Sequence, residues 1–127
     1  MNSIRTFQAG TSRKRGEGLR VGVVRYLPRG VKKKDYARLD YFDVWLPLLA
    51  PSKELLKWVH VDPTERWSTF VERYTREMLN HTDSRQAIQL LAKLAQQTRI
   101  SIGCYCSDEA HCHRSILRKL IKQAMKG

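Results

Sequence analysis

The sequence lacks the features of two large classes of protein. No run of about 18 apolar residues occurs in its 127 residues, so no membrane-spanning helix is expected. Its first ten residues contain no apolar block that could serve as a secretory signal, which makes the cytoplasm the expected location. Cysteine is scarce, and the three that occur crowd into residues 104–112. An odd, crowded set is a poor disulfide framework and is more typical of a metal site or a reactive thiol.

Acidic residues are also few. Twelve Asp and Glu stand against 24 Lys and Arg, which gives a formal net charge of +12. The excess is uneven, because residues 1–38 hold eleven basic and two acidic residues, whereas residues 39–127 hold thirteen and ten. Such a positive field attracts polyanions, so a phosphate-bearing small molecule or a nucleic acid is an expected partner. A solvated, solubilising surface would account for the same charge.

Strand patterns occur in three places. Three segments, residues 4–8, 19–26 and 98–103, show the alternation of apolar and polar residues or the enrichment in β-branched residues that is typical of strands. Residues 9–18 are mostly Gly, Ser, Thr and basic residues, which predicts a flexible basic loop between the first two strands. Residues 39–50 are aromatic and apolar without a regular period, so we expect an extended, partly buried connection there.

Helix signals fill most of the remaining chain. Ser52, Asp62 and Asp83 are good N-cap residues for three successive helices. A fourth helix is expected from about His111 to Met125. The third helix should bury one stripe of apolar residues, namely Ala87, Leu90, Leu91, Leu94 and Ala95. This order of elements predicts a single, small α/β domain with a mainly parallel three-stranded sheet flanked by helices.

Two chemically rich segments follow predicted strands. In parallel sheets, ligands bind beyond the carboxyl ends of the strands. Residues 26–34 are basic and follow the second strand, and residues 104–114 follow the last strand and contain all three cysteines. We therefore expect these two segments to meet at one edge of the sheet.

The same two segments resemble a known family. Residues 25–33 read Arg-Tyr-Leu-Pro-Arg-Gly-Val-Lys-Lys, which is similar to the signature of YeaO-like proteins, and Leu27 stands where tryptophan is usual. Cys104, Asp108 and residues 111–115 resemble the "C…D…H-C-H-R-S" signature of the broader group called domain of unknown function 488. Cys106 stands where that family more often has an acid. The resemblance covers nearly the whole chain. It implies an α/β fold and two motifs that share one site, without an established reaction.

One interpretation of this edge is an anion site served by a thiol nucleophile. A helix N-terminus and neighbouring His and Arg side chains stabilise a thiolate, so either Cys104 or Cys112 would attack a nucleotide or another phosphorylated small molecule. The base would be His111 or His113. The candidate catalytic residues are Cys104, Cys112, His113 and Asp108, and the candidate anion-binding residues are Arg25, Arg29, Lys33 and Arg114. For either thiol, packing as a small apolar core residue is the alternative.

Zinc binding is another interpretation, because zinc prefers thiolate and imidazole ligands. The ligand set would be Cys104, Cys106, His111 and Cys112. The spacing lacks the two separated halves of standard structural zinc sites, which counts against a stably bound metal.

The alternative function is a non-catalytic nucleic-acid-binding module with a structural or metal-binding Cys/His cluster. Basic residues in the segments 13–15 and 29–34 lie near aromatic residues that can stack on bases, namely Tyr26, Tyr36 and Tyr41. The residues alone do not decide between an enzyme and a binding module.

Overall fold

A parallel four-stranded sheet organises the fold. The computed structural model describes residues 4–127. The strands are Arg5–Gln8 (β1), Leu19–Gly22 (β2), Val44–Trp45 (β3) and Ile100–Cys104 (β4), in the spatial order β1-β4-β2-β3. Every pair is parallel. The central strand β4 is buried along its whole length, as a strand covered on both faces should be.

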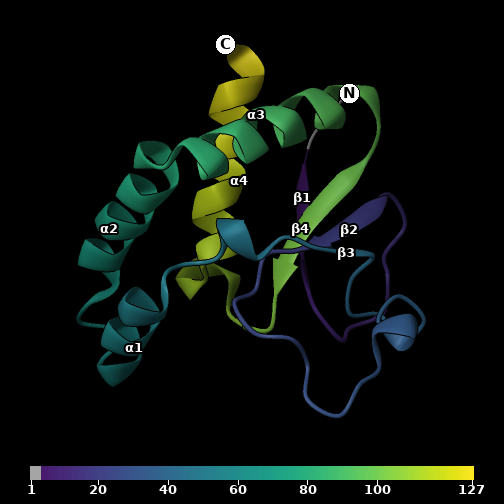
Figure 1. The fold of residues 1–127 in the computed structure, drawn as a ribbon, viewed down its shortest axis with the longest axis horizontal. Coiled ribbons are helices and arrows are strands. Elements are labelled where there is room, and N and C mark those ends of the chain that lie inside the picture. Colours follow the sequence, from purple (N-terminus) through teal and green to yellow (C-terminus); the bar gives the residue numbers. More distant parts are fainter. Residues whose placement is uncertain (1–3) are drawn as a thin grey trace.

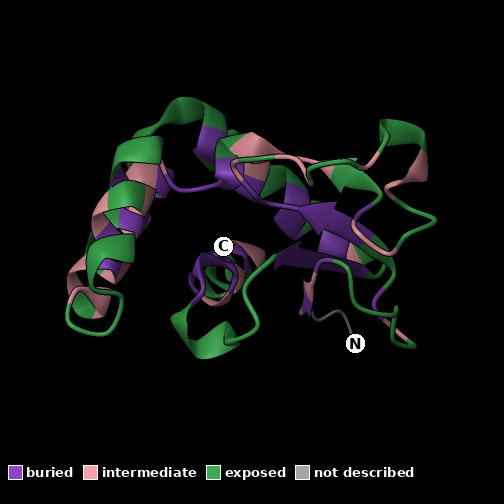
Figure 2. Ribbon diagram, turned by 90° about the horizontal axis from the view of Figure 1, so that it is seen from below, coloured by how far each residue is buried: buried purple, intermediate pink, exposed green. Residues whose placement is uncertain are grey.

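The helices gather beside this sheet. The α-helices of the described chain are Lys53–Val61 (α1), Trp67–Asn80 (α2), Thr82–Gln97 (α3) and His113–Lys126 (α4). Short 3-10 turns cover Lys33–Asp35 (η1), Pro47–Leu49 (η2) and Glu109–His111 (η3). Figure 1 shows the α-helices grouped on one side of the molecule, with the sheet and the long loops beside them. Buried residues follow the strands and the inward stripes of the helices (Figure 2). Within residues 4–127 no helix is both long and apolar enough to cross a membrane.

The α/β class and the mainly parallel sheet are confirmed, and the strand count is four instead of the predicted three. The additional strand, β3, has two residues, and it pairs Val44 with Val21 and Trp45 with Gly22. Two residues are too few to show a period of two, so only the pairing with β2 identifies this strand. The remainder of residues 39–50 is partly buried, as expected, but it is not extended throughout, because it includes the 3-10 turn η2.

The helix predictions are right in kind and wrong at some boundaries. Ser52 caps α1, because its Oγ accepts the N–H of Leu55 at 3.2 Å. The carboxylate of Asp62 instead holds a turn, and α2 begins later, at Trp67. In α3, Leu90 is 66% exposed, contrary to the prediction. The buried stripe of that helix contains Ile88, Leu91, Ala92 and Ala95.

A buried ion pair fixes the start of β2. The Arg20 Nε donates to Glu17 Oε1 at 2.9 Å, and both side chains are almost fully buried. The same guanidinium lies 4.4 Å from the ring centroid of Phe7 and donates from Nη1 to the carbonyl of Asp40 at 2.6 Å. These contacts join the end of the loop 9–18 to β1 and β2. The flexibility of that loop stays a prediction.

Gly18 at the end of this loop should be the glycine least tolerant of a side chain. It has φ +70°, and an added Cβ would run into the backbone carbonyl of Arg99. Gly30 has a similar φ of +73° with open space around it. Gly30→Ala should therefore cost about 1 kcal/mol of unfolding free energy for conformation alone. Gly18→Ala should cost about 3 kcal/mol, because the backbone must also move. Urea unfolding of both variants measures this, and equal losses would contradict the packing argument.

Candidate functional site

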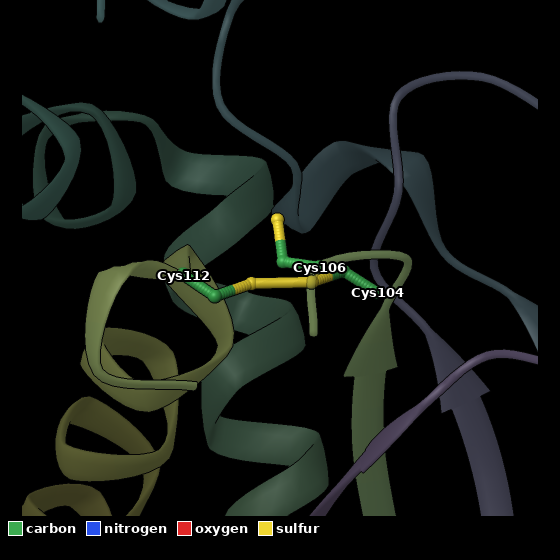
Figure 3. A group of neighbouring side chains, drawn as sticks. All are labelled: Cys104, Cys106 and Cys112. Atoms are coloured by element: carbon green, nitrogen blue, oxygen red, sulfur yellow. A yellow bond between two sulfur atoms is a disulfide. The ribbon is translucent and has the colours of Figure 1, made fainter. Parts of the chain in front are cut away.

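The three cysteines meet at the carboxyl edge of the sheet. Cys104 ends β4, Cys112 is the N-cap of α4, and Cys106 lies in the loop between them (Figure 3). Their sulfur atoms all lie within 4.8 Å of one another. Cys104 and Cys112 are buried and joined as a disulfide, and Cys106 is exposed and free. The sequence analysis judged the three cysteines a poor disulfide framework. In the structure they form one disulfide and leave the Cys106 thiol free.

One arginine contacts all three cysteines. Arg114 lies in the first turn of α4 and is only 4% exposed. Its Nη1 donates to the Cys106 carbonyl at 2.7 Å, to Cys104 Sγ at 3.2 Å and to Cys112 Sγ at 3.6 Å. A guanidinium at this distance stabilises negative charge on sulfur. When the disulfide is reduced, this guanidinium lies close enough to both sulfur atoms to stabilise negative charge on either of them.

The other edge of the same guanidinium has no partner. Arg114 Nε is buried without a hydrogen bond, and within residues 4–127 Nη2 makes none either. Burial lowers the pKa of Arg114, but arginine stays protonated at neutral pH. An unmet buried donor costs about 1–3 kcal/mol. Nε and Nη2 form the flat fork with which an arginine binds carboxylate or phosphate oxygens in pairs.

His113 is a neutral base beside Cys112. Its Nε2 is 2.6 Å from the carbonyl of Val23, which can only accept, so Nε2 carries the proton. Its Nδ1 is then an acceptor, 3.9 Å from Cys112 Sγ. Burial lowers the pKa of His113 to about 4, and the charges of Arg114 and Arg25 contribute in the same direction. At neutral pH this imidazole can take up a thiol proton only through Nδ1.

Asp108 and His111 form a separate pair at the surface. Asp108 caps η3, since its carboxylate accepts the N–H of Ala110 at 3.0 Å. Its other oxygen is 2.9 Å from His111 Nδ1, and this hydrogen bond is the largest cause that lowers the pKa of Asp108 against the smaller effect of desolvation. The ring of His111 packs edge-on against Trp67. Asp108 therefore orients His111 and makes no bond to His113 or Arg114.

The proposed zinc ligands are only partly assembled. The three sulfur atoms lie within 4.8 Å of one another, but Cys104 and Cys112 are joined as a disulfide and so do not offer the thiolates that zinc binds. His111, the fourth residue of the predicted set, points its Nδ1 at Asp108 and is not among the grouped ligands. The positive charge of Arg114 also rests against two of the three sulfur atoms, which weakens the attraction for a cation.

The other predicted anion-binding residues have different surroundings. Arg25 donates from Nε and Nη2 to the carbonyls of Ala50 and Pro51 at 3.0–3.1 Å. These two nitrogen atoms therefore hold the backbone that precedes α1. Arg29 and Lys33 are exposed, and within residues 4–127 they form no hydrogen bond or ion pair with the cysteine loop. Lys33 lines a cavity of about 280 Å³, together with residues that include Leu27, Lys34, Tyr36 and Trp45.

The two sequence motifs do meet, through a residue that sequence reasoning overlooked. The hydroxyl of Tyr105 donates to the carbonyl of Tyr26 at 2.8 Å, which links the cysteine loop to the segment after β2. Burial raises the pKa of Tyr105 to about 12, so this donor keeps its proton. Its position between Cys104 and Cys106 was the only signal in the sequence.

A larger cavity lies elsewhere. It has a volume of about 610 Å³ and is lined by Ser52, Glu54, Leu55, Arg73, Arg76, Glu77, Asn80 and His81. None of these residues belongs to the cysteine site. The cysteine site is the stronger candidate, because it combines cysteine sulfur atoms, a neutral imidazole and a buried guanidinium whose Nε has no hydrogen-bond partner.

Comparison with known proteins identifies relatives for almost the whole chain. Residues 4–125 match the family model described as the Active DUF488-N3 subclade. The uncharacterised protein Rv3073c of Mycobacterium tuberculosis is 32% identical over 105 residues, which are 83% of this chain and 81% of the relative. The uncharacterised protein YeaO of Escherichia coli K12 is 35% identical over 77 residues, 61% of this chain and 63% of the relative. No solved structure gives a significant match.

The lowered pKa of His113 should make the protein less stable in acid. As the pH falls from 7 to 4, the unfolded chain takes up a proton near the ordinary pKa of 6.5, and the native imidazole does not. The free energy of unfolding should therefore fall by about 3 kcal/mol over this range from His113 alone. His113→Gln should remove that part of the pH dependence, while His81→Gln, at an exposed site, should keep it. Urea unfolding at several pH values tests this, and identical profiles for the two variants would refute it.

Proposed function

This chain belongs to the YeaO-like family of domain of unknown function 488, within its Active DUF488-N3 subclade, and from its site we propose a thiol-dependent enzyme. The substrate would be a small molecule that presents a phosphate or a similar oxyanion at the carboxyl edge of the sheet. Cys112 would be the nucleophile in the reduced protein. His113 would be its base and Arg114 the anion-binding residue.

The unpartnered edge of Arg114 is the observation that supports this proposal. A buried guanidinium whose Nη1 already contacts the reactive sulfur atoms leaves Nε and Nη2 for a ligand. One residue can therefore place an oxyanion directly beside the nucleophile. Such fixed positioning lowers the entropic part of an activation barrier.

Cys112 is preferred to Cys104 because it has more activating neighbours. It is the N-cap of α4, where the helix dipole favours negative charge. It also has Nδ1 of the neutral His113 at 3.9 Å to accept its proton, and Arg114 Nη1 at 3.6 Å to stabilise the thiolate. Cys104 has the arginine alone, at 3.2 Å.

Replacing Arg114 should separate its two tasks. In reduced Cys106→Ser protein, Arg114→Gln should slow alkylation by iodoacetamide at pH 7 about tenfold, because the thiolate loses its cationic partner. Inorganic phosphate should slow alkylation in the parent protein and not in this variant. Arg114→Lys keeps the charge and loses the fork, so it should retain most of the reactivity and lose the protection by phosphate.

Lys119→Gln is the matched control, because it removes one exposed positive charge from the same helix. Phosphate should protect this variant as well as the parent. Equal protection of the Arg114 variants would place the phosphate elsewhere, and the proposed anion site would fail.

The nucleic-acid-binding module is retained as the second proposal because of one observation. Lys32, Lys33 and Lys34 are all exposed, and within residues 4–127 none of them is in an ion pair. By contrast, Arg13 is occupied, because its Nη2 lies 2.6 Å from the Asp43 carboxylate. Three free ammonium groups in a row can contact phosphates of a nucleic-acid backbone.

Changing these lysines tests the second proposal. Lys32→Ala with Lys33→Ala and Lys34→Ala should weaken binding to a labelled oligonucleotide and reduce the salt slope, log Kd against log salt, by about 2–3. Cys112→Ala with His113→Ala should leave both quantities unchanged. An unchanged slope in the lysine variant would remove the basis of this proposal.

A further inference from the structure

The exposed Cys106 lies beside a buried disulfide. Its sulfur is within 4.8 Å of the sulfur atoms of both Cys104 and Cys112, each of which is only 2% exposed (Figure 3). A thiol or disulfide from solvent cannot easily reach the buried pair, but it can reach Cys106. We propose that the three cysteines form a thiol–disulfide exchange relay, in which Cys106 connects the buried pair to thiols in solution. This activity goes beyond the proposed function and requires no phosphorylated substrate.

The hydrogen bonds of Arg114 indicate which sulfur is attacked. In thiol–disulfide exchange, the sulfur that is better stabilised as a thiolate leaves more readily. Arg114 Nη1 is closer to Cys104 Sγ, at 3.2 Å, than to Cys112 Sγ, at 3.6 Å. Cys104 is therefore the better leaving group. Attack on Cys112 also avoids a bond between Cys104 and Cys106, which only one residue separates.

The exchange step balances without an oxidant or a reductant. The Cys106 thiolate gives an electron pair to Cys112 Sγ and forms a new disulfide. The bond between Cys104 and Cys112 breaks, and its electron pair stays on Cys104 Sγ, which Arg114 stabilises. An external dithiol then attacks the exposed Cys106 sulfur of the new disulfide. The dithiol is oxidised to its own disulfide, and the protein ends with three thiols.

The backbone of the cysteine loop holds the attacking residue in place. Arg114 Nη1 donates to the Cys106 carbonyl at 2.7 Å, so the arginine that stabilises the leaving group also fixes the position of the nucleophile. Tyr105, one residue earlier, is held by its bond to Tyr26 and by Gln8, whose Nε2 donates to the Tyr105 carbonyl at 3.1 Å. Cys106 is thus kept next to the disulfide from both sides of the loop.

Removing the exposed thiol should isolate the buried disulfide. Chelator-treated, oxidised protein is mixed with dithiothreitol, and the appearance of thiols is followed over time. Cys106→Ser should be reduced at least about tenfold more slowly than the wild type, because only direct attack on a buried sulfur remains. The control Ser107→Ala changes the next exposed residue of the loop and should be reduced at the wild-type rate. Equal rates for Cys106→Ser and the wild type would overturn the relay.

A second measurement uses the wild-type protein alone. Oxidised protein is quenched in acid, its free thiol is blocked, and it is cut after Tyr105 by chymotrypsin and after Glu109 by a Glu-specific protease, which places each cysteine in its own peptide. The relay predicts a Cys106–Cys112 linkage together with Cys104–Cys112. A linkage of Cys104 to Cys112 alone, with Cys106 blocked in every molecule, would overturn it. Neither experiment involves phosphate, so failure of the relay leaves the anion site intact, and the reverse also holds.

Discussion

The buried guanidinium of Arg114 is the contact on which the rest of the site depends. Through Nη1 it joins the end of β4, the cysteine loop and the N-cap of α4, which are three parts of the chain with no regular backbone pairing between them. A buried charge is costly unless other groups compensate it. Here the compensation comes from sulfur atoms and one carbonyl, and it is incomplete, because Nε has no partner. The site therefore contains a buried positive charge that its neighbours compensate only in part.

The charge beside Arg114 differs between the oxidised and the reduced state of the cysteines. When Cys104 and Cys112 are joined, they are neutral, and the acceptors of Arg114 are two weak sulfur atoms and the Cys106 carbonyl. Reduction allows a thiolate to form against the same guanidinium, beside the neutral ring of His113. A substrate oxyanion on the Nε and Nη2 edge would complete the neutralisation. The proposed anion site and the proposed relay thus use opposite edges of one side chain.

The location of the site could be predicted from the sequence because of a general constraint. Parallel strands end at the same edge, and the register confirms this by pairing Gln8 with Cys104 and Gly22 with Gly103. The segments after β2 and β4 therefore had to meet. Their individual contacts could not be predicted in the same way. The spacing of His111 suggested a metal ligand, but η3 turns its side chain toward Asp108. The apolar pattern of α3 placed Leu90 in the core, but packing against α4 decides which face of α3 is buried, and Leu90 lies outside that face.

The sequence by itself determined the α/β class, the family, and the chemical groups that lie beyond the last strand. These follow from local patterns and from motifs that are contiguous or nearly so in the chain. Only the tertiary structure decided which cysteine is exposed, that burial keeps His113 neutral while its Nε2 bonds to Val23, and that Nε of Arg114 has no partner. Each of these depends on burial and on groups up to 90 residues apart in the chain. Burial and long-range pairing arise only when the strands and helices have packed, and no local pattern contains them.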